Sequence, residues 1–201
     1  MPSAGELDNE LVLEALRATT RPLAAPGERY AYSNVGYILL AEVLATTAGE
    51  PLGALAHRRV FAPLDMSATH LGEEPETHQP QPGFPGTVGD GGLWTTANDL
   101  LCWLMAMNAE YLGRDATRLI QRPGTLDDGA ALTYAWGINV RPHTHGPMYT
   151  HGGNWPGWAA KTVRQPSTSI AVALLSTSDD VLLVSDTTVR IAEALSFDQC
   201  E

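Results

Sequence analysis

The chain has 201 residues, 44% of them hydrophobic and 17% charged, which is the balance of one soluble globular domain rather than of a disordered or fibrous chain. Twelve basic residues against 23 acidic ones give a formal net charge of −11, so a nucleic acid or an anionic membrane is disfavoured as a partner. No apolar run approaches the roughly 18 residues that a membrane span needs. The acidic segment 1–10 lacks the basic and apolar regions of a signal peptide, so a cytoplasmic location is the default expectation.

Two residue types are scarce. Cys102 and Cys200 are too few for a disulfide framework or a four-cysteine zinc site, so redox chemistry is not indicated. Lys161 is the only lysine. Any motif whose chemistry requires a lysine would have to use this residue.

The first half of the chain predicts helices. Asp8 can cap a helix whose apolar residues recur at helical spacing over residues 11–16. A second helix is expected to follow Asn34 and to end at Gly49, and a third, short helix covers roughly residues 52–60.

A long polar segment separates these helices from the next one. Residues 71–92 are rich in Pro, Gly, Glu, Gln and Thr, and their length predicts a functional or wandering loop. Thr96 and Asp99 have capping-box spacing, which predicts the start of an apolar helix that continues through Met107.

After about residue 130 the pattern changes to short runs bounded by turn residues. Strands are predicted over residues 134–140, 148–153, 158–164 and 169–176. Turn residues at 154–157 and 165–168 favour antiparallel neighbours, and residues 181–195 predict a closing helix. The expected fold class is therefore α+β, with one structural domain made of a mostly helical region, 1–130, and an antiparallel sheet with a covering C-terminal helix, 131–201.

Residues 30–34 (YAYSN) lie between a Pro-Gly turn and a predicted helix, where side chains can face a cleft. A phenol acts as a base near neutral pH only if nearby cations favour the phenolate. An asparagine such as Asn34 can hold a substrate amide or carbonyl. Taken alone, the tyrosines could equally be packing residues whose hydroxyls find partners.

A second candidate motif, His151-Gly152-Gly153, ends a predicted strand, where glycine marks close approach of another backbone or a ligand. His151 and Gly153 share one face by the period of two, so a cationic or hydrogen-bonding imidazole would stand beside an open backbone edge. A turn that follows a surface histidine is the alternative.

Other sites were weighed on the same grounds. His143 and His145 could join His151 around zinc, but no cysteine or ligand helix accompanies them, so surface histidines are expected and no metal is predicted. Residues 89–92 (GDGG) lack the lysine and spacing of a phosphate-binding loop. No cofactor is predicted.

Four motifs occur together in a defined order. They are residues 26–37 (PGERYAYSNVGY), 60–66 (VFAPLDM), 91–96 (GGLWTT, followed by Asp99-Leu100) and 151–153 (HGG). This order resembles the serine β-lactamase-like family, which includes class C β-lactamases, penicillin-binding carboxypeptidases, D-aminopeptidases and related esterases. The resemblance runs from about Leu11 to the final helix.

The resemblance implies roles for particular residues. Tyr32 would exchange protons with the nucleophile or leaving group, and Asn34 would orient substrate. His151, Gly152 and Gly153 would form the strand motif that lines the cleft, with the backbone N–H of Asn154 as one oxyanion-hole donor. His-Gly-Gly in place of Lys-Thr-Gly leans towards the esterase or peptidase branches.

The family's first motif, Ser-x-x-Lys, is absent from this sequence, because Lys161 is preceded three residues earlier by Trp158. The resemblance therefore implies a serine hydrolase that acts on ester, amide or lactam substrates through an acyl-enzyme. It is present here as a truncated chain that should not turn over alone. The alternative is a non-catalytic pseudoenzyme that binds a peptide or D-amino-acid ligand.

The missing portion would also supply strands beside residues 169–176. The apolar run 170–175 does not alternate, as expected for a strand buried on both faces and paired on both sides. An open edge there predicts self-association.

Overall fold

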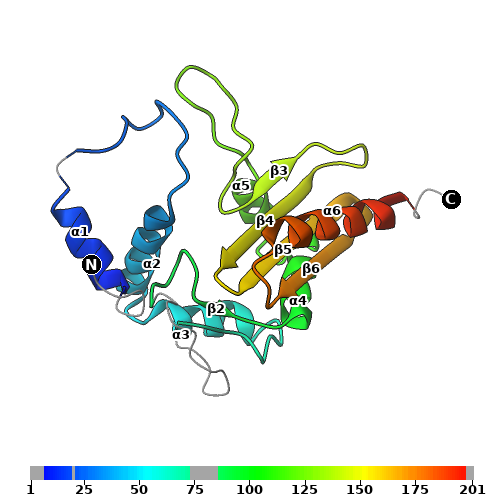
Figure 1. The fold of residues 1–201 in the computed structure, drawn as a ribbon, viewed down its shortest axis with the longest axis horizontal. Helices are drawn as coiled ribbons and strands as arrows, with labels where there is room; N and C mark the ends of the chain where they lie inside the picture. The colour runs from blue at the N-terminus through cyan, green and yellow to red at the C-terminus, as the bar shows by residue number, and fades with distance from the viewer. Residues whose placement is uncertain (1–6, 20, 73–85, 198–201) are drawn as a thin grey trace. The chain divides into compact units, whose positions relative to one another are not determined.

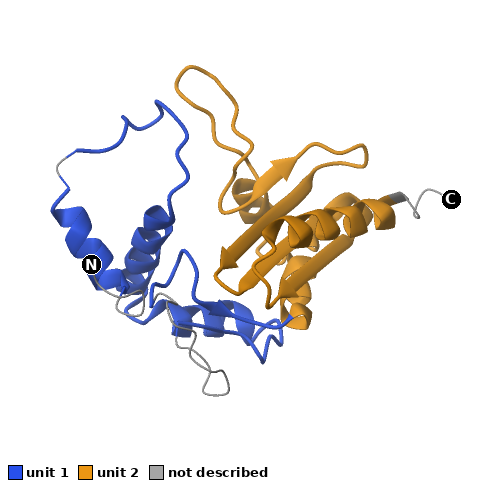
Figure 2. Cartoon of the chain, viewed as in Figure 1, with its two compact units in different colours: residues 1–96 blue, residues 97–201 orange. Residues whose placement is uncertain are grey.

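The computed structural model describes residues 7–19, 21–72 and 86–197. The chain divides into two compact units, Met1–Thr96 and Ala97–Glu201 (Figure 2).

The first unit begins with two of the predicted helices. Helix α1 (Asn9–Arg17) starts where the Asp8 carboxylate accepts a hydrogen bond from the Leu11 N–H, as the sequence predicts. Helix α2 (Asn34–Ala48) ends at Gly49, whose φ of +69° is the left-handed conformation that glycine adopts readily. Both helices are confirmed with their caps.

The third predicted helix is present but changes its hydrogen bonding. Helix α3 (Leu52–Ala56) continues directly as a π-helical turn, His57–Phe61. A Cβ on Gly53 would lie 2.5 Å from the Leu71 carbonyl oxygen, so only glycine lets strand β1 (His70–Leu71) lie so close to α3.

Strand β1 pairs antiparallel with β2 (Leu93–Trp94), and this two-stranded sheet ties together the two ends of segment 71–92. The short pairing was not predicted. The predicted functional or wandering loop falls mostly on residues 73–85, which lie outside the described residues.

The second unit contains the larger sheet. In chain order it comprises α4 (Ala97–Asn108), α5 (Arg114–Ile120), β3 (Asn139–Arg141), β4 (Met148–Trp155), β5 (Trp158–Gln165), a 3₁₀ turn (Pro166–Thr168), β6 (Ile170–Ser176) and α6 (Val181–Phe197). The strands are all antiparallel in the order β3-β4-β5-β6 (Figure 1). This mixture of helices and antiparallel sheet confirms the α+β class.

Helix α6 covers one face of this sheet, and the core of the unit lies between them (Figure 1). The residues that form it are Met148, Val163, Ile170, Val172 and Ala192. Val163 and Ala192 have no exposed surface. Helix α4 packs against β5 and β6 and belongs to the second unit, which begins at Ala97.

One detail of the sheet differs from the sequence-based expectation: the predicted strand 134–140 is reduced to β3, and Tyr134 forms only an isolated bridge to Asn139. Among the described residues β6 pairs with β5 alone, so this strand has the open edge that the sequence predicts for this chain.

No single helix among residues 7–19, 21–72 and 86–197 is long and apolar enough to cross a membrane. The bent pair formed by α2 and residues 52–61 reaches the threshold by length and composition only.

Candidate active site

The Tyr-Ser-Asn motif lies at the start of α2 in the first unit. The Ser33 hydroxyl caps the helix by accepting a hydrogen bond from the Gly36 N–H at 3.2 Å. Tyr32 therefore precedes the helix and Asn34 is its first residue, and both side chains are exposed, Tyr32 by 54%. The cap explains why a serine stands between the two candidate residues, and it gives Ser33 a structural role.

The segment before Tyr32 is held by local hydrogen bonds. The Glu28 carboxylate accepts from the Ala25 N–H at 2.8 Å, and the Arg29 guanidinium donates to the Leu23 carbonyl at 2.8 Å. Burial raises the pKa of the neighbouring Tyr30, and the negative charge that Tyr32 carries when ionised raises it further. The Pro-Gly-Glu-Arg turn thus fixes where the chain enters α2.

The His-Gly-Gly motif lies on β4 in the second unit. Strand β3 pairs with β4 only at residues 148–150, whereas β5 pairs with β4 along residues 149–155. The backbone of residues 151–155 is consequently paired on one side only among the described residues. This is the open strand edge that the sequence predicted beside the histidine.

Strand register places His151 on the face opposite α6. Directly paired residues share a face, and Val163, in the core under α6, pairs with Thr150, whereas His151 pairs with Thr162. The same alternation puts Gly153 on the His151 face and Gly152 on the α6 face. Gly152, Gly153 and Asn154 are all exposed.

The His151 imidazole is held by a tyrosine that the sequence analysis did not single out. The Tyr134 hydroxyl lies 3.1 Å from His151 Nε2, with the two rings tilted by 59°. Burial lowers the pKa of His151 below its ordinary 6.5, and the positive charge of Lys161 lowers it further. Both effects favour the neutral imidazole over the cationic form considered from the sequence.

Lys161 lies directly across from Gly152 on the α6 face. A Cβ on Gly152 would be 3.2 Å from Lys161 Cδ and 3.0 Å from the Ala160 carbonyl oxygen, so glycine makes room for the lysine stem. Burial lowers the pKa of Lys161, and the nearby charge of Arg141 lowers it further. The only lysine of the sequence thus lies on the face of the sheet away from His151.

A buried arginine lies on the His151 face of the sheet, two residues along β5 from Thr162, the partner of His151. Arg164, 3% exposed, pairs with Tyr149 and stacks on its ring with the guanidinium carbon 4.5 Å from the centroid. With the Gln121 amide oriented to fit its neighbours, its oxygen accepts from Arg164 at 3.0 and 3.2 Å and its nitrogen donates to the Tyr149 hydroxyl. Burial lowers the pKa of Arg164 to about 10.

Arg164 also donates to the Asn108 amide oxygen at 3.4 Å. Asn108 ends α4 and Gln121 follows α5, so the arginine links both helices to the sheet. An arginine inside a predicted strand was the only signal that could have drawn attention to it.

His143 and His151, two of the three histidines considered for zinc, each bind a different side chain. His143 Nδ1 takes a hydrogen bond from the buried Gln165 amide at 3.0 Å, while His151 is bound to Tyr134. No group of three His, Cys, Asp or Glu side chains suited to a metal occurs in the described part of the chain.

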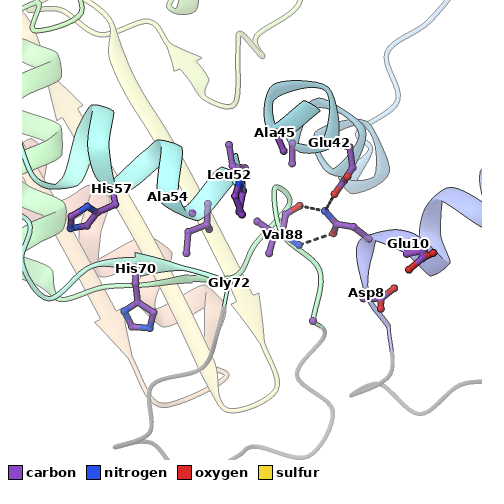
Figure 3. Close-up of a pocket in the computed structure, with 16 residues that line it drawn as sticks. Asp8, Glu10, Glu42, Ala45, Leu52, Ala54, His57, His70, Gly72 and Val88 are labelled. Carbon is purple, nitrogen blue, oxygen red and sulfur yellow. Dashed lines mark hydrogen bonds between the residues drawn. The ribbon is translucent and has the colours of Figure 1, made fainter. Parts of the chain in front are cut away.

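A pocket of about 700 Å³ lies within the first unit, between α1, α2 and α3 (Figure 3). Asn9 is one of the residues that line this pocket: its amide nitrogen donates to Glu42 at 2.6 Å and to the Val88 carbonyl, and its amide oxygen accepts from the Val88 N–H. Asp8 caps α1. Two acidic side chains of the pocket, Asp8 and Glu42, therefore make hydrogen bonds that stabilise the first unit. None of the predicted site residues lines the pocket.

Comparison with known proteins finds relatives by sequence and neighbours by fold. A D-aminopeptidase of Brucella anthropi is 28% identical over 149 residues, which is 66% of this chain and 28% of that protein. The solved β-lactamase/D-alanine carboxypeptidase of Yersinia pestis has a TM-score of 0.77 at 19% identity, covering all of this chain and 64% of its own. The octameric penicillin-binding protein homologue of Pyrococcus abyssi has a TM-score of 0.73 at 18% identity, covering 98% of this chain and 49% of its own.

The chain therefore spans less than a third of the D-aminopeptidase that it matches and about half to two thirds of these structures. The sequence model of the family described as Beta-lactamase matches residues 2–195, nearly the whole chain. The resemblance drawn from the four ordered motifs is confirmed, and the chain belongs to the β-lactamase family.

Proposed function

We propose that this chain is part of a serine acyl-hydrolase that acts through an acyl-enzyme and takes an ester, amide or lactam substrate. The observation that carries the proposal is the His151 site: a neutral, anchored imidazole and a glycine share one face of β4 beside an unpaired strand edge. An extended substrate can add its backbone to such an edge. The D-aminopeptidase relative favours amides and peptides of D-amino acids within this class.

The roles follow the family pattern residue by residue. Tyr32 moves the proton between nucleophile and leaving group, Asn34 orients the substrate, and His151 with Gly153 lines the cleft. The Asn154 N–H acts as an oxyanion-hole donor, and loss of such a donor typically lowers the rate by ~100- to 1,000-fold.

The sequence of 201 residues contains no Ser-x-x-Lys. The proposal therefore requires a nucleophile-bearing segment that this sequence does not include, and the 201-residue chain by itself should not form an acyl-enzyme. The coverage of 49–64% of the structural neighbours supports this reading.

The test begins with the DNA upstream of Met1, translated in the same frame. We expect a Ser-x-x-Lys there, and the extended protein should react with a fluorophosphonate probe at that serine while the 201-residue chain does not. His151→Gln in the extended protein should lower ester hydrolysis, whereas the matched variant His57→Gln, in the other unit, should not. Rapid ester hydrolysis by the 201-residue chain that survives replacement of every serine in turn would overturn the proposal.

A non-catalytic binding protein is the second candidate, favoured by the absent nucleophile motif alongside a folded His151 site. In that case the 201-residue chain should bind D-alanine amide saturably, and no upstream Ser-x-x-Lys should exist. Labelling of any serine by the fluorophosphonate probe would exclude this alternative.

Self-association is proposed through the free side of β6, which pairs with β5 alone among the described residues. The Pyrococcus abyssi homologue is octameric by its own description. Light scattering should show an oligomer that Leu175→Lys, which places a charge on this edge strand, dissociates. An unchanged oligomer, or a monomeric parent chain, would contradict it.

A further inference from the structure

We propose that Tyr134 is a positioning residue that fixes His151 in the tautomer with its proton on Nδ1, so that His151 offers an N–H donor to an acceptor oxygen of the substrate. The proposed role in substrate binding rests on the proposed function, whereas the tautomer itself does not.

The first step is the position of Tyr134 beside the open edge. Tyr134 bridges to Asn139 of β3, and Asn139 pairs in turn with Thr150 of β4. The Tyr134 carbonyl also accepts a hydrogen bond from the Gly124 N–H at 3.2 Å. The tyrosine is thus anchored through its backbone to β3, at the residue that pairs with Thr150, the neighbour of His151 in β4.

The second step is the direction of the hydrogen bond. The hydroxyl oxygen and Nε2 are 3.1 Å apart, and a neutral imidazole has one donor and one acceptor nitrogen. A ring nitrogen with an ordinary pKa near 6.5 is a far better acceptor than a phenol oxygen, and a phenol is a good donor. The favoured arrangement is therefore Tyr134 O–H donating to Nε2.

The third step follows from the two nitrogens of one ring. The hydrogen bond made by one nitrogen determines the protonation of the other, so Nδ1 carries the hydrogen. No hydrogen bond to Nδ1 is found among residues 7–19, 21–72 and 86–197. This N–H can therefore donate to a carbonyl or carboxylate oxygen of a substrate.

This assignment changes the chemistry expected of His151. A histidine protonated at Nδ1 and bonded at Nε2 is a neutral electrophilic donor and has no free lone pair with which to act as a base. Proton transfer then belongs to Tyr32.

The experiment uses the 201-residue chain labelled with ¹⁵N-histidine. Long-range ¹H–¹⁵N spectra at pH 8 report which ring nitrogen carries the proton, and the His151 signals are identified by their loss in His151→Gln. We expect a protonated Nδ1 and an unprotonated Nε2. Tyr134→Phe, which keeps the ring, should move the population towards Nε2–H, whereas Tyr111→Phe, a tyrosine after α4, should leave it unchanged.

A protonated Nε2 in the parent chain would overturn the proposal, and so would a folded Tyr134→Phe variant with an unchanged tautomer. Titration with N-acetyl-D-alanine tests the proposed function separately. A saturable shift of the His151 Nδ1–H signal would support substrate binding there. No shift would contradict that binding while the tautomer assignment still stands on the first measurement.

Discussion

Replacing Gln165 should show how strongly a buried amide holds the second unit together. Its side chain has no exposed surface and makes four hydrogen bonds. The amide nitrogen donates to the Gly146 carbonyl at 2.9 Å and to His143 at 3.0 Å, and the oxygen accepts from Thr168 and Ser196, each at 2.9 Å. These bonds join the end of β5 to the loop before β4, to the 3₁₀ turn and to α6.

Gln165→Met keeps the side-chain volume and removes all four bonds. Ser196 keeps a bond to the Ala192 carbonyl and Thr168 keeps one to the Gln165 backbone, so the uncompensated losses fall on Gly146 and His143. An unsatisfied buried group costs roughly 1 to 3 kcal/mol, and water reaching the half-buried histidine reduces the sum. We expect the free energy of unfolding to fall by about 2 to 4 kcal/mol.

Urea denaturation followed by circular dichroism measures this loss as a lower midpoint at an unchanged slope. Thr168→Val is the graded control, because Ser196 still satisfies the Gln165 oxygen, and it should cost at most about 1 kcal/mol. A Gln165→Met protein within about 0.5 kcal/mol of the parent would show that this amide does not stabilise the unit.

Four further outcomes are expected. Gly152→Ala should lower the stability of the second unit by about 1 kcal/mol or more, because the added Cβ would lie 3.0 Å from the Ala160 carbonyl oxygen. The Cβ of Gly153→Ala would meet nothing within 4 Å, so this control should leave the urea midpoint unchanged. Equal losses in the two variants would contradict the close approach of the Ala160 carbonyl to Gly152. Lys161→Met should raise the pKa of His151 towards 6.5 in an NMR titration, because it removes a repelling charge. Since the pKa of His151 is lower in the folded than in the unfolded chain, its contribution to stability is present above pH 6.5 and is lost as the pH falls towards the folded pKa. His151→Gln should therefore make the free energy of unfolding depend less on pH in this range. A stronger dependence on pH in His151→Gln would refute this argument. Gly89→Ala should destabilise the first unit by about 3 kcal/mol, because residue 89 has φ of +116° and the added Cβ would lie 2.6 Å from the Tyr37 carbonyl oxygen. Gly49→Ala is strained only in φ and should cost about 1 kcal/mol. Similar losses of stability by calorimetry would show that the contact with Tyr37 does not add to the cost.

The parts of the fold that the sequence predicts are those set by neighbouring residues. Asp8 and Gly49 mark helix ends through bonds within a few residues, so α1 and α2 could be placed. Helix α5 was missed because it has seven residues and no side-chain cap, with Gly113 at φ +86° before it. Helices this short gain little from local signals and form mainly through packing.

The candidate site shows the same division. His151 and Gly153 could be placed on one strand face from the period of two, and the open edge beside them is present. The contact from Tyr134 joins residues 17 positions apart through a bridge that no local pattern indicates. The neutral state of the imidazole depends on burial and on Lys161 from the next strand, and both are properties of the folded unit.

Helix α2 carries an exposed apolar face. Its inner residues Ile38 and Ala41 are buried, while the outer face exposes apolar side chains by 40% to 59%. These are Leu39, Leu40, Val43 and Leu44. A helix that is apolar all round is buried in a stable soluble protein, and the one charged residue of α2, Glu42, is already bonded to Asn9. Under the proposed function, the segment that supplies the nucleophile must also bring an apolar surface to α2.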